Sequence, residues 1–429
     1  MTSLYLILWI AGGVLLQLAI YLCIGFWRHW RSYQALRHAA SEFEIAVNPE
    51  VEPEVAQSTA AAWAGYRTFV VERRALEDAS GQVCSFYLAP QDGKPLAAFS
   101  PGQFLTFQLD APAHTGDSQS VVRCYSLSDA PQPNRYRISV KRAPAPAGSP
   151  FPAGVSSNYL HDHVQVGSQL QVRAPAGHFY IDRSNAPVVL IGGGVGITPM
   201  LSMLNWCLSE QPARELWLFY GVRNSAELVM QTHLKDMATQ HSNFHLHLCM
   251  SDPLPGDVVE LSQLSVQCHQ SRVDVALLRK LLPLKPYHYY ICGPTPMLQS
   301  LVPALEDWGV PDGRIHFEAF GPASIPRRKS ANGAKVAAHG DDQSEAVLVT
   351  FAKSGKKEAW TPGMGSLLEF AEGHGIAVSS GCRAGGCGSC QTSIRTGEVA
   401  YTQAPDFDPE PGSCLLCVCT PKTAVTLEA

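Results

Sequence analysis

The chain has 429 residues, of which 46% are hydrophobic and 16% charged, and this size and composition predict a globular protein of two or three compact units. Its formal net charge is −5, and no stripe of Lys and Arg with interleaved aromatic residues occurs, which argues against a nucleic-acid-binding protein. The thirteen cysteines are odd in number and follow no regular framework. This pattern favours metal ligation in a reducing compartment over disulfides.

The chain begins with a long apolar run, LYLILWIAGGVLLQLAIYLCIGFW at residues 4–27, which contains no charged side chain. A helix of this length extends for about 36 Å, enough to cross a hydrocarbon core about 30 Å thick. The uncharged start MTS lacks the basic region of a signal peptide, and a buried core helix of this length without any charge would be unusual. We therefore predict a single-pass transmembrane anchor over residues 1–30. Arg28, Arg31 and Arg37 follow the run, so the positive-inside rule leaves the large C-terminal body on the cytoplasmic side.

The rest of the chain divides by composition into two linkers and three folded units. Short β-like runs between Pro and Gly turns predict an antiparallel barrel or sandwich, and the apolar strands that then alternate with helix-like segments predict an α/β domain with a parallel sheet. The last unit is compact and rich in cysteine. The predicted boundaries are a stalk linker at 31–62, the β-barrel at 63–185, the α/β domain at 186–322, a second linker at 323–345 and the cysteine-rich unit at 346–429.

The sequence SSGCRAGGCGSC at residues 379–390 contains the spacing Cys382-x4-Cys387-x2-Cys390. Plant-type [2Fe–2S] clusters are held by cysteines with this spacing and by a fourth, distant cysteine. The glycines allow a tight loop that points backbone N–H groups at the sulfur atoms. A structural zinc site is the alternative, but it usually brings two CxxC pairs or histidines at set distances. The spacing alone leaves the fourth ligand open among the cysteines of SCLLCVCT, residues 413–420.

With these cysteines, residues 346–429 resemble a plant-type ferredoxin domain, which implies a β-grasp fold. In that family the last ligand precedes a proline by four positions, before a closing strand. Cys417 precedes Pro421 by four positions, inside CLLCVCTPKTAVTLEA, so the resemblance implies that Cys417 is the fourth ligand. Cys419 is the second choice, and Cys414 and Cys419 are otherwise expected to be small buried residues.

Two further strings, RCYSLSDAP at 123–131 and IGGGVGITPM at 191–200, lie upstream in chain order. Glycines between an apolar strand and a helix let the pyrophosphate of a dinucleotide approach the backbone and the helix N-terminus, although a Gly-rich turn alone is weak evidence. With the longer strings around it, residues 64–322 resemble the ferredoxin–NADP reductase superfamily. The resemblance implies a flavin-binding barrel followed by a nicotinamide-binding α/β domain.

The resemblance assigns flavin-binding roles to several residues of the barrel. Arg123 would bind the flavin pyrophosphate, Tyr125 would lie against the isoalloxazine ring, and Ser126 would hydrogen-bond near flavin N5, although a serine at this position alone would be an ordinary turn residue. The VKR strand contributes Val140 and Lys141. The second phosphate loop, GVSSNYLHD, contributes Gly154, Val155, Ser156 and Ser157.

The resemblance also implies a nicotinamide site. The Gly-rich turn would supply Gly192, Gly193, Gly194, Gly196, Thr198 and Pro199, and the motif CGPTPM would supply Cys292 and Gly293. Glu318 and Phe320, in FEAFGP, would lie near the flavin. Ser126, Cys292 and Glu318 are the expected catalytic residues. Taken alone, Cys292 would be a small buried residue and Glu318 a solvated surface acid.

The choice of cofactors follows from smaller features. The second phosphate loop resembles FAD-binding members, which favours FAD over FMN. At the strand end CMSDP, Ser251 is followed by Asp252 where NADPH-dependent members have arginine, and a carboxylate favours NADH because it repels a 2′-phosphate. Arg223, in the string GVRNS, is expected to lie near this strand end and would offset the repulsion by Asp252. NADPH therefore remains the alternative to NADH. His245 and His247 alternate along a strand, and we expect exposed histidines there rather than a metal site.

The function implied is an NAD(P)H-dependent oxidoreductase that passes electrons from NADH through FAD and a [2Fe–2S] cluster to an acceptor protein, such as an oxygenase, a hydroxylase or a desaturase. The 23-residue second linker, as a flexible coil, spans about 25–30 Å and would let the ferredoxin domain move between the reductase and the acceptor. The alternatives are a self-contained quinone or metal reductase and a redox-sensing or assembly subunit.

Overall fold

The computed structural model describes residues 63–429, except 64, 113–117, 146–147, 149–152, 258–265, 321–345, 377, 379, 384, 403–404 and 406, together with residue 17. Residues 59–429 form one compact unit. The expected anchor, apart from residue 17, lies outside the described residues, as do both predicted linkers. None of the helices in the described part of the chain combines the length and the apolar character needed to cross a bilayer.

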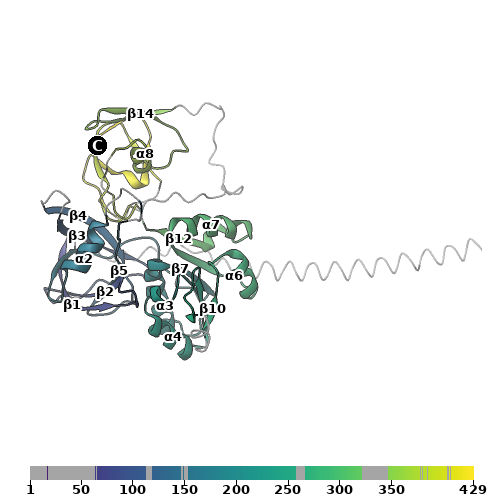
Figure 1. Cartoon of the computed structure of the whole chain (residues 1–429). Helices are drawn as coiled ribbons and strands as arrows, with labels where there is room; N and C mark the ends of the chain where they lie inside the picture. The colour runs from purple at the N-terminus through teal and green to yellow at the C-terminus, as the bar shows by residue number, and fades with distance from the viewer. Residues whose placement is uncertain are drawn as a thin grey trace, which may run out of the picture. The chain divides into compact units, whose positions relative to one another are not determined.

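The first folded unit is an antiparallel sheet whose edge strands meet (Figure 1). The strand order is β4-β3-β6-β1-β2-β5, and an isolated bridge joins Leu127, just after β4, to Ile138 in β5. The antiparallel β domain expected for the flavin is therefore confirmed. Its strands are β1 (Arg67–Leu76), β2 (Val83–Pro90), β3 (Phe104–Pro112), β4 (Ser118–Ser126), β5 (Tyr136–Lys141) and β6 (Gln169–Val172).

Apolar side chains fill the inside of this sheet, and the helix α2 (Val155–His163) packs against the same core. Phe69, Phe86 and Phe107 are fully buried there, and α2 adds Leu160. Buried aromatic and β-branched residues fit the pleated surface of strands, which is why this sequence forms them. The core fixes the position of β4 and β5, and these two strands carry most of the residues expected to bind the flavin.

The second unit is a parallel sheet with the strand order β10-β9-β8-β7-β11-β12, which confirms the expected α/β domain. The chain runs outward from β7 in one direction and then returns to its other side with β11. This reversal creates a switch point at the carboxyl ends of β7 and β11, where α/β proteins bind ligands. The strands are β7 (Val188–Gly193), β8 (Leu216–Val222), β9 (Phe244–Met250), β10 (Gln267–His269), β11 (His288–Gly293) and β12 (Ile315–Ala319).

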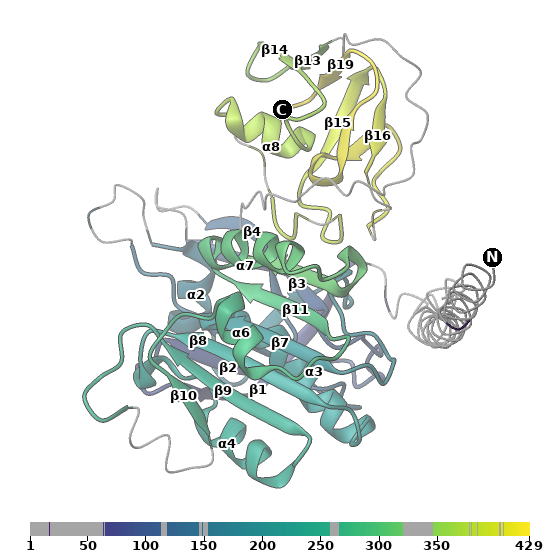
Figure 2. The ribbon, with the colours of Figure 1, turned by 90° about the vertical axis from the view of Figure 1, so that its right-hand side faces the viewer.

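Helices cover both faces of the parallel sheet (Figure 2). Along β7, Val188 and Leu190 face the core shared with α3 (Ile197–Glu210) and α4 (Gln231–Gln240), whereas Val189 and Ile191 face α6 (Val275–Leu281) and α7 (Thr295–Asp307). A strand buried on both faces is a continuous apolar run, which is the pattern of the sequence PVVLIGGG.

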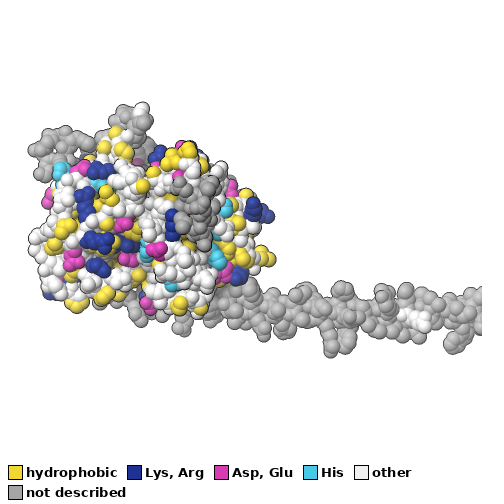
Figure 3. Space-filling view, turned by 60° about the horizontal axis from the view of Figure 1, so that its bottom comes forward, with side chains coloured by type: hydrophobic (Ala, Val, Ile, Leu, Met, Phe, Trp, Pro, Cys, Tyr) yellow, Lys and Arg dark blue, Asp and Glu magenta, His cyan; other side chains and the backbone are white. Residues whose placement is uncertain are grey.

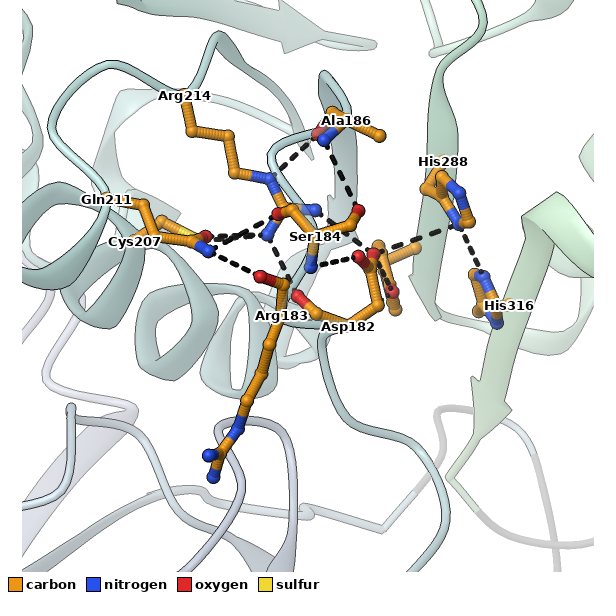
Figure 4. Close-up of polar contacts among 10 residues, drawn as sticks. Asp182, Arg183, Ser184, Ala186, Cys207, Gln211, Arg214, His288 and His316 are labelled. Atoms are coloured by element: carbon orange, nitrogen blue, oxygen red, sulfur yellow. Dashed lines mark hydrogen bonds and ion pairs between the residues drawn. The ribbon is translucent and has the colours of Figure 1, made fainter. Parts of the chain in front are cut away.

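A buried ion-pair network joins the end of the barrel to the parallel sheet (Figure 4). The Arg214 side chain is fully buried, and its Nε donates to the Ala186 carbonyl at 2.8 Å. Its Nη1 donates to the Asp182 carbonyl at 2.9 Å, and its Nη2 donates to Asp182 Oδ2 at 3.0 Å. The Tyr290 hydroxyl of β11 donates to the same carboxylate at 3.0 Å. These contacts fix the segment that connects the two domains.

The third unit is a mixed five-stranded sheet with the helix α8 (Leu367–Gly373) packed on its core, an arrangement compatible with the expected β-grasp fold. A capping box between Ser366 and Glu369 begins α8. The sheet order is β14-β13-β19-β15-β17, and β16 pairs with β18. The strands are β13 (Val347–Phe351), β14 (Lys356–Trp360), β15 (Gln391–Thr396), β16 (Val399–Tyr401), β17 (Ser413–Leu415), β18 (Cys419–Pro421) and β19 (Val425–Leu427).

The surface charge is mixed. On the face shown in Figure 3, Lys and Arg side chains lie among Asp, Glu and uncharged side chains. Charges of both signs are therefore mixed on this face.

Candidate functional site

A cavity of about 360 Å³ brings residues of all three folded units together. Its wall consists of the start of β3, strands β4 and β5 of the barrel, the turn before α3 with the start of that helix, the end of β12 with the next residue, and the loop at residues 380–383. Eight of the residues expected to contact the flavin or the nicotinamide line it, namely Arg123, Tyr125, Ser126, Val140, Lys141, Thr198, Glu318 and Phe320. Cys292, the phosphate loop at 154–157 and the residues Arg223, Ser251 and Asp252 lie outside this wall.

Strand β4 positions the flavin-facing residues. Tyr125 packs edge-on against Phe107 of β3, with ring centroids 5.6 Å apart, and burial raises the pKa of its phenol, so that the hydroxyl stays protonated. Ser126 ends β4, opposite Phe104, and is only 6% exposed. Arg123 Nη1 donates to the Val122 carbonyl at 2.7 Å while the side chain lines the cavity. This edge offers a planar apolar surface flanked by a hydroxyl and a cation.

The N-terminus of α2 provides a site suited to a phosphate. Gly154 precedes the helix without a side-chain cap, and its N–H donates to the Ala143 carbonyl at 2.8 Å. A Cβ at Gly154 would lie 2.7 Å from Ala143 Cβ, so the close approach of the two segments requires glycine. The Ser156 hydroxyl is buried and has no partner among the described residues. A helix N-terminus and an unpartnered hydroxyl fit the diphosphate of FAD.

The Gly-rich turn after β7 lies against the end of β11. The turn is a 3₁₀ helix, Gly194–Gly196, which leads directly into α3. A Cβ at Gly196 would lie 2.2 Å from the Cys292 carbonyl oxygen, so only glycine permits this approach. Thr198 is 2% exposed, and its hydroxyl donates to the Val195 carbonyl at 3.0 Å. The start of α3 therefore opens toward the cavity with its backbone N–H groups uncapped by side chains.

Cys292 and Glu318 are cross-strand neighbours on β11 and β12. Cys292 is fully buried, and this burial, with the nearby Glu318, raises the pKa of its thiol well above the usual value. Burial also raises the pKa of Glu318 to about 8, and its Oε2 has no partner among the described residues. The Glu318 carboxyl is therefore protonated at neutral pH in the wall of the cavity. It is not the solvated surface acid that its sequence alone would suggest.

The residues expected to choose between NADH and NADPH lie at the carboxyl ends of β8 and β9. The Ser251 N–H donates to the Val222 carbonyl at 3.1 Å, and the Asp252 N–H donates to the Arg223 carbonyl at 2.9 Å. The Arg223 guanidinium forms an ion pair with Glu227, with Nε 2.7 Å from Glu227 Oε1. Glu227 therefore partly neutralises the one cation that was expected to offset Asp252.

The cysteines expected to hold the cluster form two pairs. Cys390 Sγ lies 3.2 Å from Cys417 Sγ, and the Cys382 N–H donates to Cys387 Sγ at 3.2 Å. The Gly386 N–H donates to Cys382 Sγ, also at 3.2 Å. Within the described residues, no three or more His, Cys, Asp or Glu side chains are grouped around one point as a single metal ion requires. Two thiol pairs with N–H donors to sulfur fit the donor set of a two-iron cluster.

The other two cysteines of the C-terminal group are core residues. Cys414 and Cys419 are both fully buried in the apolar core of the ferredoxin-like unit, as expected for small buried side chains. The side chain of Cys419 is hydrogen-bonded to Cys414, and this bond raises the pKa of the Cys419 thiol. The structure thus places Cys417 beside Cys390 and keeps Cys419 with Cys414.

Sequence reasoning missed Cys124, which belongs to the RCYS motif but was given no role. Its side chain is hydrogen-bonded to Cys382 and Cys387. Its Sγ also lies 3.4 Å from Thr106 Oγ1. The only sequence signal for this contact was a cysteine within the flavin-binding motif of a chain that also has a cluster-binding loop. The signal was too weak to predict a contact between residues more than 250 positions apart.

The expectation of exposed histidines on β9 was wrong for His247. This residue is 1% exposed, stacks on Phe219 at 4.7 Å between ring centroids, and its Nδ1 lies 3.0 Å from His269 Nε2. Burial lowers the pKa of His247 to about 4, so the ring is neutral. His245 is half-buried and lies over Trp217 at 4.2 Å. The alternation of polar and apolar residues on β9 does not predict exposure, because helices cover both faces of this sheet.

Comparison with known proteins identifies the domains. Residues 75–181 match the oxidoreductase FAD-binding domain, residues 190–302 the oxidoreductase NAD-binding domain, and residues 350–422 the 2Fe-2S iron-sulfur cluster binding domain. A flavohemoprotein of Halalkalibacterium halodurans is 38% identical over 280 residues, which are 65% of this chain and 65% of the relative. The chain thus spans slightly less than two thirds of the length of this relative.

Two solved structures are also similar. The FAD/NAD-binding domain of a nitric oxide dioxygenase from Vibrio cholerae O1 biovar El Tor is 33% identical, with a TM-score of 0.51, and the match covers 60% of this chain and all of that one. Phthalate dioxygenase reductase is 25% identical, with a TM-score of 0.49, over 85% of this chain and 98% of that one.

These matches define the class of protein as an oxidoreductase with an FAD-binding and an NAD-binding domain. The chain belongs to the FAD- and NAD-binding oxidoreductases of the ferredoxin–NADP reductase type and carries a C-terminal 2Fe-2S domain. FAD, a nicotinamide dinucleotide and a [2Fe–2S] cluster are its cofactors.

Proposed function

We propose that this protein is the NADH-dependent reductase component of an electron-transfer system, and that it passes single electrons from its [2Fe–2S] cluster to an oxygenase, hydroxylase or desaturase. FAD, when bound, accepts electrons in pairs from a nicotinamide and releases them singly, which matches a two-electron donor to a one-electron cluster. The protein supplies the positions of the cofactors and the electrostatic environment around them.

The observation that carries the proposal is the shared wall of the cavity. Ser126 and Tyr125 of the flavin-binding strand, Thr198 of the nicotinamide-binding turn and Cys382 of the cluster loop all line the same space of about 360 Å³. Electron transfer requires short distances between carriers, and one cavity wall gives all three units access to the same volume. A redox sensor does not need sustained turnover and would therefore not need this arrangement.

The residues have separate roles in this proposal. Arg123 and the N-terminus of α2, with the Ser156 hydroxyl, would hold the diphosphate of FAD, and Tyr125 would cover one face of its ring. Glu318, with its pKa raised to about 8 by burial, keeps a proton in the wall of the cavity at neutral pH. Cys382, Cys387, Cys390 and Cys417 would hold the cluster.

The preference for NADH rests on the ends of β8 and β9. Asp252 places a carboxylate where a 2′-phosphate would be repelled, and Glu227 engages the Arg223 guanidinium that would otherwise attract it. We expect kcat/KM for NADH to exceed that for NADPH, and Asp252→Arg to narrow the difference.

Membrane attachment is part of the proposal. The uncharged run at residues 4–27 and the arginines that follow it support an anchor with the catalytic body on the cytoplasmic side. An anchored reductase would suit an acceptor that is itself in or at the membrane. Fractionation of cells would test the location, and crosslinking from isolated membranes would identify the acceptor. Full-length protein recovered in the soluble fraction without detergent would contradict the anchor.

The experiment that tests the function uses purified protein with FAD and cluster. We expect NADH to bleach first the flavin and then the cluster absorption under anaerobic conditions, with sustained turnover using both ferricyanide and cytochrome c. Cys390→Ser should keep ferricyanide reduction and lose at least 90% of cytochrome c reduction, because the variant lacks the one-electron outlet. Absence of NADH turnover in the wild type would exclude a reductase. Full cytochrome c turnover in the variant would remove the cluster from the route.

A further inference from the structure

One contact between the barrel and the 2Fe-2S domain has no role in the function described so far. The Arg173 guanidinium contacts two aromatic rings, with its carbon 4.7 Å from the ring centroid of Tyr66 and 4.7 Å from that of Phe407. Tyr66 precedes β1 of the barrel, whereas Phe407 belongs to the 2Fe-2S domain. A guanidinium stacks on aromatic faces through charge–quadrupole attraction, so Arg173 holds the two domains by a specific contact.

Phe407 is itself attached to the cluster loop. Its N–H donates to the Gly385 carbonyl at 3.0 Å. A Cβ at Gly388 would lie 2.7 Å from the Phe407 ring, so the ring lies directly against the backbone between Cys387 and Cys390. A displacement of Phe407 would therefore also move the loop that carries three of the four cluster ligands.

Arg173 is attached in a similar way to β3, the strand that pairs with the flavin-binding strand β4. It follows β6, and its N–H donates to the Thr106 carbonyl at 2.9 Å. Thr106 Oγ1 lies 3.4 Å from Cys124 Sγ, and Cys124 in turn contacts Cys382 and Cys387. The Arg173 Nε is buried and has no hydrogen-bond partner among the described residues, so the contacts of the guanidinium with the two rings stand out.

We propose that Tyr66, Arg173 and Phe407 form a clasp that positions the cluster loop over the flavin cavity for transfer of one electron from the flavin to the cluster. The clasp deepens the proposed function and rests on it. Arg173 and Phe407 are positioning residues, since neither lines the cavity. When the clasp opens, the cluster loop leaves Cys124 and becomes accessible to an external acceptor.

The central test compares Arg173→Gln with Phe407→Leu in the cluster-loaded, FAD-loaded protein. Stopped-flow mixing with NADH separates flavin bleaching from cluster bleaching. We expect Arg173→Gln to slow reduction of the cluster about 3- to 10-fold, from the usual strength of a cation–π contact, while flavin reduction changes less than twofold. Arg173→Lys should give an intermediate rate because it keeps the charge and loses the planar stack.

A matched control and a mutant cycle isolate the contact. Arg73 stacks on Tyr87 at 4.8 Å within the barrel and is exposed, so Arg73→Gln removes the same kind of contact without reaching the 2Fe-2S domain. It should leave both rates unchanged. The double variant Arg173→Gln, Phe407→Leu should be no slower than the slower single variant, because both changes break one contact. If the rate reductions of the two single variants multiplied in the double variant, the residues would act separately, and this result would overturn the proposal.

A second measurement does not depend on electron transfer. The closed clasp covers the Cys124 thiol with the cluster loop, so alkylation of Cys124 by N-ethylmaleimide, followed by peptide mass spectrometry, should be at least threefold faster in Arg173→Gln. Cys84, fully buried in the barrel, is the internal control and should not change. Equal Cys124 alkylation in wild type and variant would overturn the clasp even if cluster reduction were slow. If NADH fails to reduce the wild-type cluster, the proposed function fails, while the alkylation result still decides the clasp.

Discussion

At the scale of single residues, burial determines the protonation of the groups around the cavity. Glu318 is the clearest case, because burial raises its pKa from an ordinary value of 4.5 to about 8. Cys292, its neighbour across β11 and β12, is also kept as a neutral thiol. The Glu318 carboxyl in the cavity wall and the buried Cys292 thiol next to it are therefore both neutral at pH 7, which costs less in a buried site than a charged carboxylate beside a thiolate.

The titration of Glu318 predicts a pH dependence of stability. Between pH 4.5 and 8 the folded state keeps a proton that the unfolded chain loses, so the stability contributed by the neutral carboxyl is full below pH 4.5 and is lost as the pH rises through 8. Glu318→Gln stays neutral throughout. In flavin-free protein, the Tm of the variant minus that of the wild type should grow from pH 5 to 8 and level off above it.

The control for the Glu318 prediction is Glu410→Gln, which removes an exposed carboxylate of the 2Fe-2S domain. Its Tm difference from wild type should stay nearly constant over the same pH range. A constant difference for Glu318→Gln as well would show that the carboxyl is ionised in the folded protein.

The fourth cluster ligand is a prediction of its own. Cys417 lies beside Cys390, whereas Cys419 is buried with Cys414 in the core. Cys417→Ser should abolish the visible absorption of the cluster. Cys419→Ser should keep the absorption but lower the stability of the domain by about 1–3 kcal/mol, because it buries a hydroxyl in an apolar core. Loss of absorption only in Cys419→Ser would reverse the assignment.

Some residues of the site could be predicted from the sequence alone, and others could not. Motifs that are local in sequence, such as RCYS and the cysteine loop, predicted residues that the fold does bring to one cavity. Cys124, Arg173 and Phe407 were missed, because a contact over such separations leaves no periodic or motif pattern in one sequence. The burial of His247 was missed because alternation on β9 reports polarity and not the helices that cover the strand.

At the scale of secondary-structure elements, most strands of the barrel and of the parallel sheet were predicted from the sequence, whereas β2 and β10 were not. β7, β8, β9 and β11 follow from their sequences. β2 (VCSFYLAP) mixes polar and apolar residues on a nearly fully buried strand, and β10 has only three residues. Both exist because their neighbours offer backbone pairing, which is a property of the whole sheet.

The connection between the barrel and the parallel sheet yields an element-scale prediction. Arg214 is fully buried and donates to the carbonyls of Ala186 and Asp182 and to the Asp182 carboxylate. Arg214→Met removes this donor from the two carbonyls and the cation from the Asp182 carboxylate, so the free energy of unfolding in urea should fall by about 3–5 kcal/mol. Arg183→Met, one residue from Asp182 and directed away from the network in Figure 4, should change it by no more than about 0.5 kcal/mol. Equal effects would show that the network contributes little.

At the scale of the whole molecule, the apolar cores divide the chain into two parts. The core of α3 and α4 also contains Val83, Phe179 and Ile181 from the flavin-binding unit and its following segment, so the FAD and NAD domains share buried surface. Among the residues that the structure describes, the core of the 2Fe-2S domain is built from that domain alone. Two such parts need not unfold in a single transition.

Cluster removal should therefore act on one part alone. Binding that is specific for the folded state stabilises it, and a loss of about 2 kcal/mol shifts the Tm of a 60–100-residue unit by about 8–16 °C. We expect chelation to lower only the transition of residues 346–429, as measured by calorimetry, and the transition of the FAD and NAD domains to stay in place. A joint shift of both transitions would show that the cluster stabilises the entire molecule.

The contact of Arg173 with Tyr66 and Phe407 has a consequence for building chimeras. A 2Fe-2S domain from a related protein without an aromatic residue at the position of Phe407 would bring its own core and its own cluster ligands but no partner for Arg173. Exchange of this domain by recombination should thus give proteins that contain every cofactor but couple them slowly. Restoring an aromatic side chain at position 407 should recover the rate of cluster reduction. Compatibility between the two parts therefore depends on the pair of positions 173 and 407 and not on either part alone.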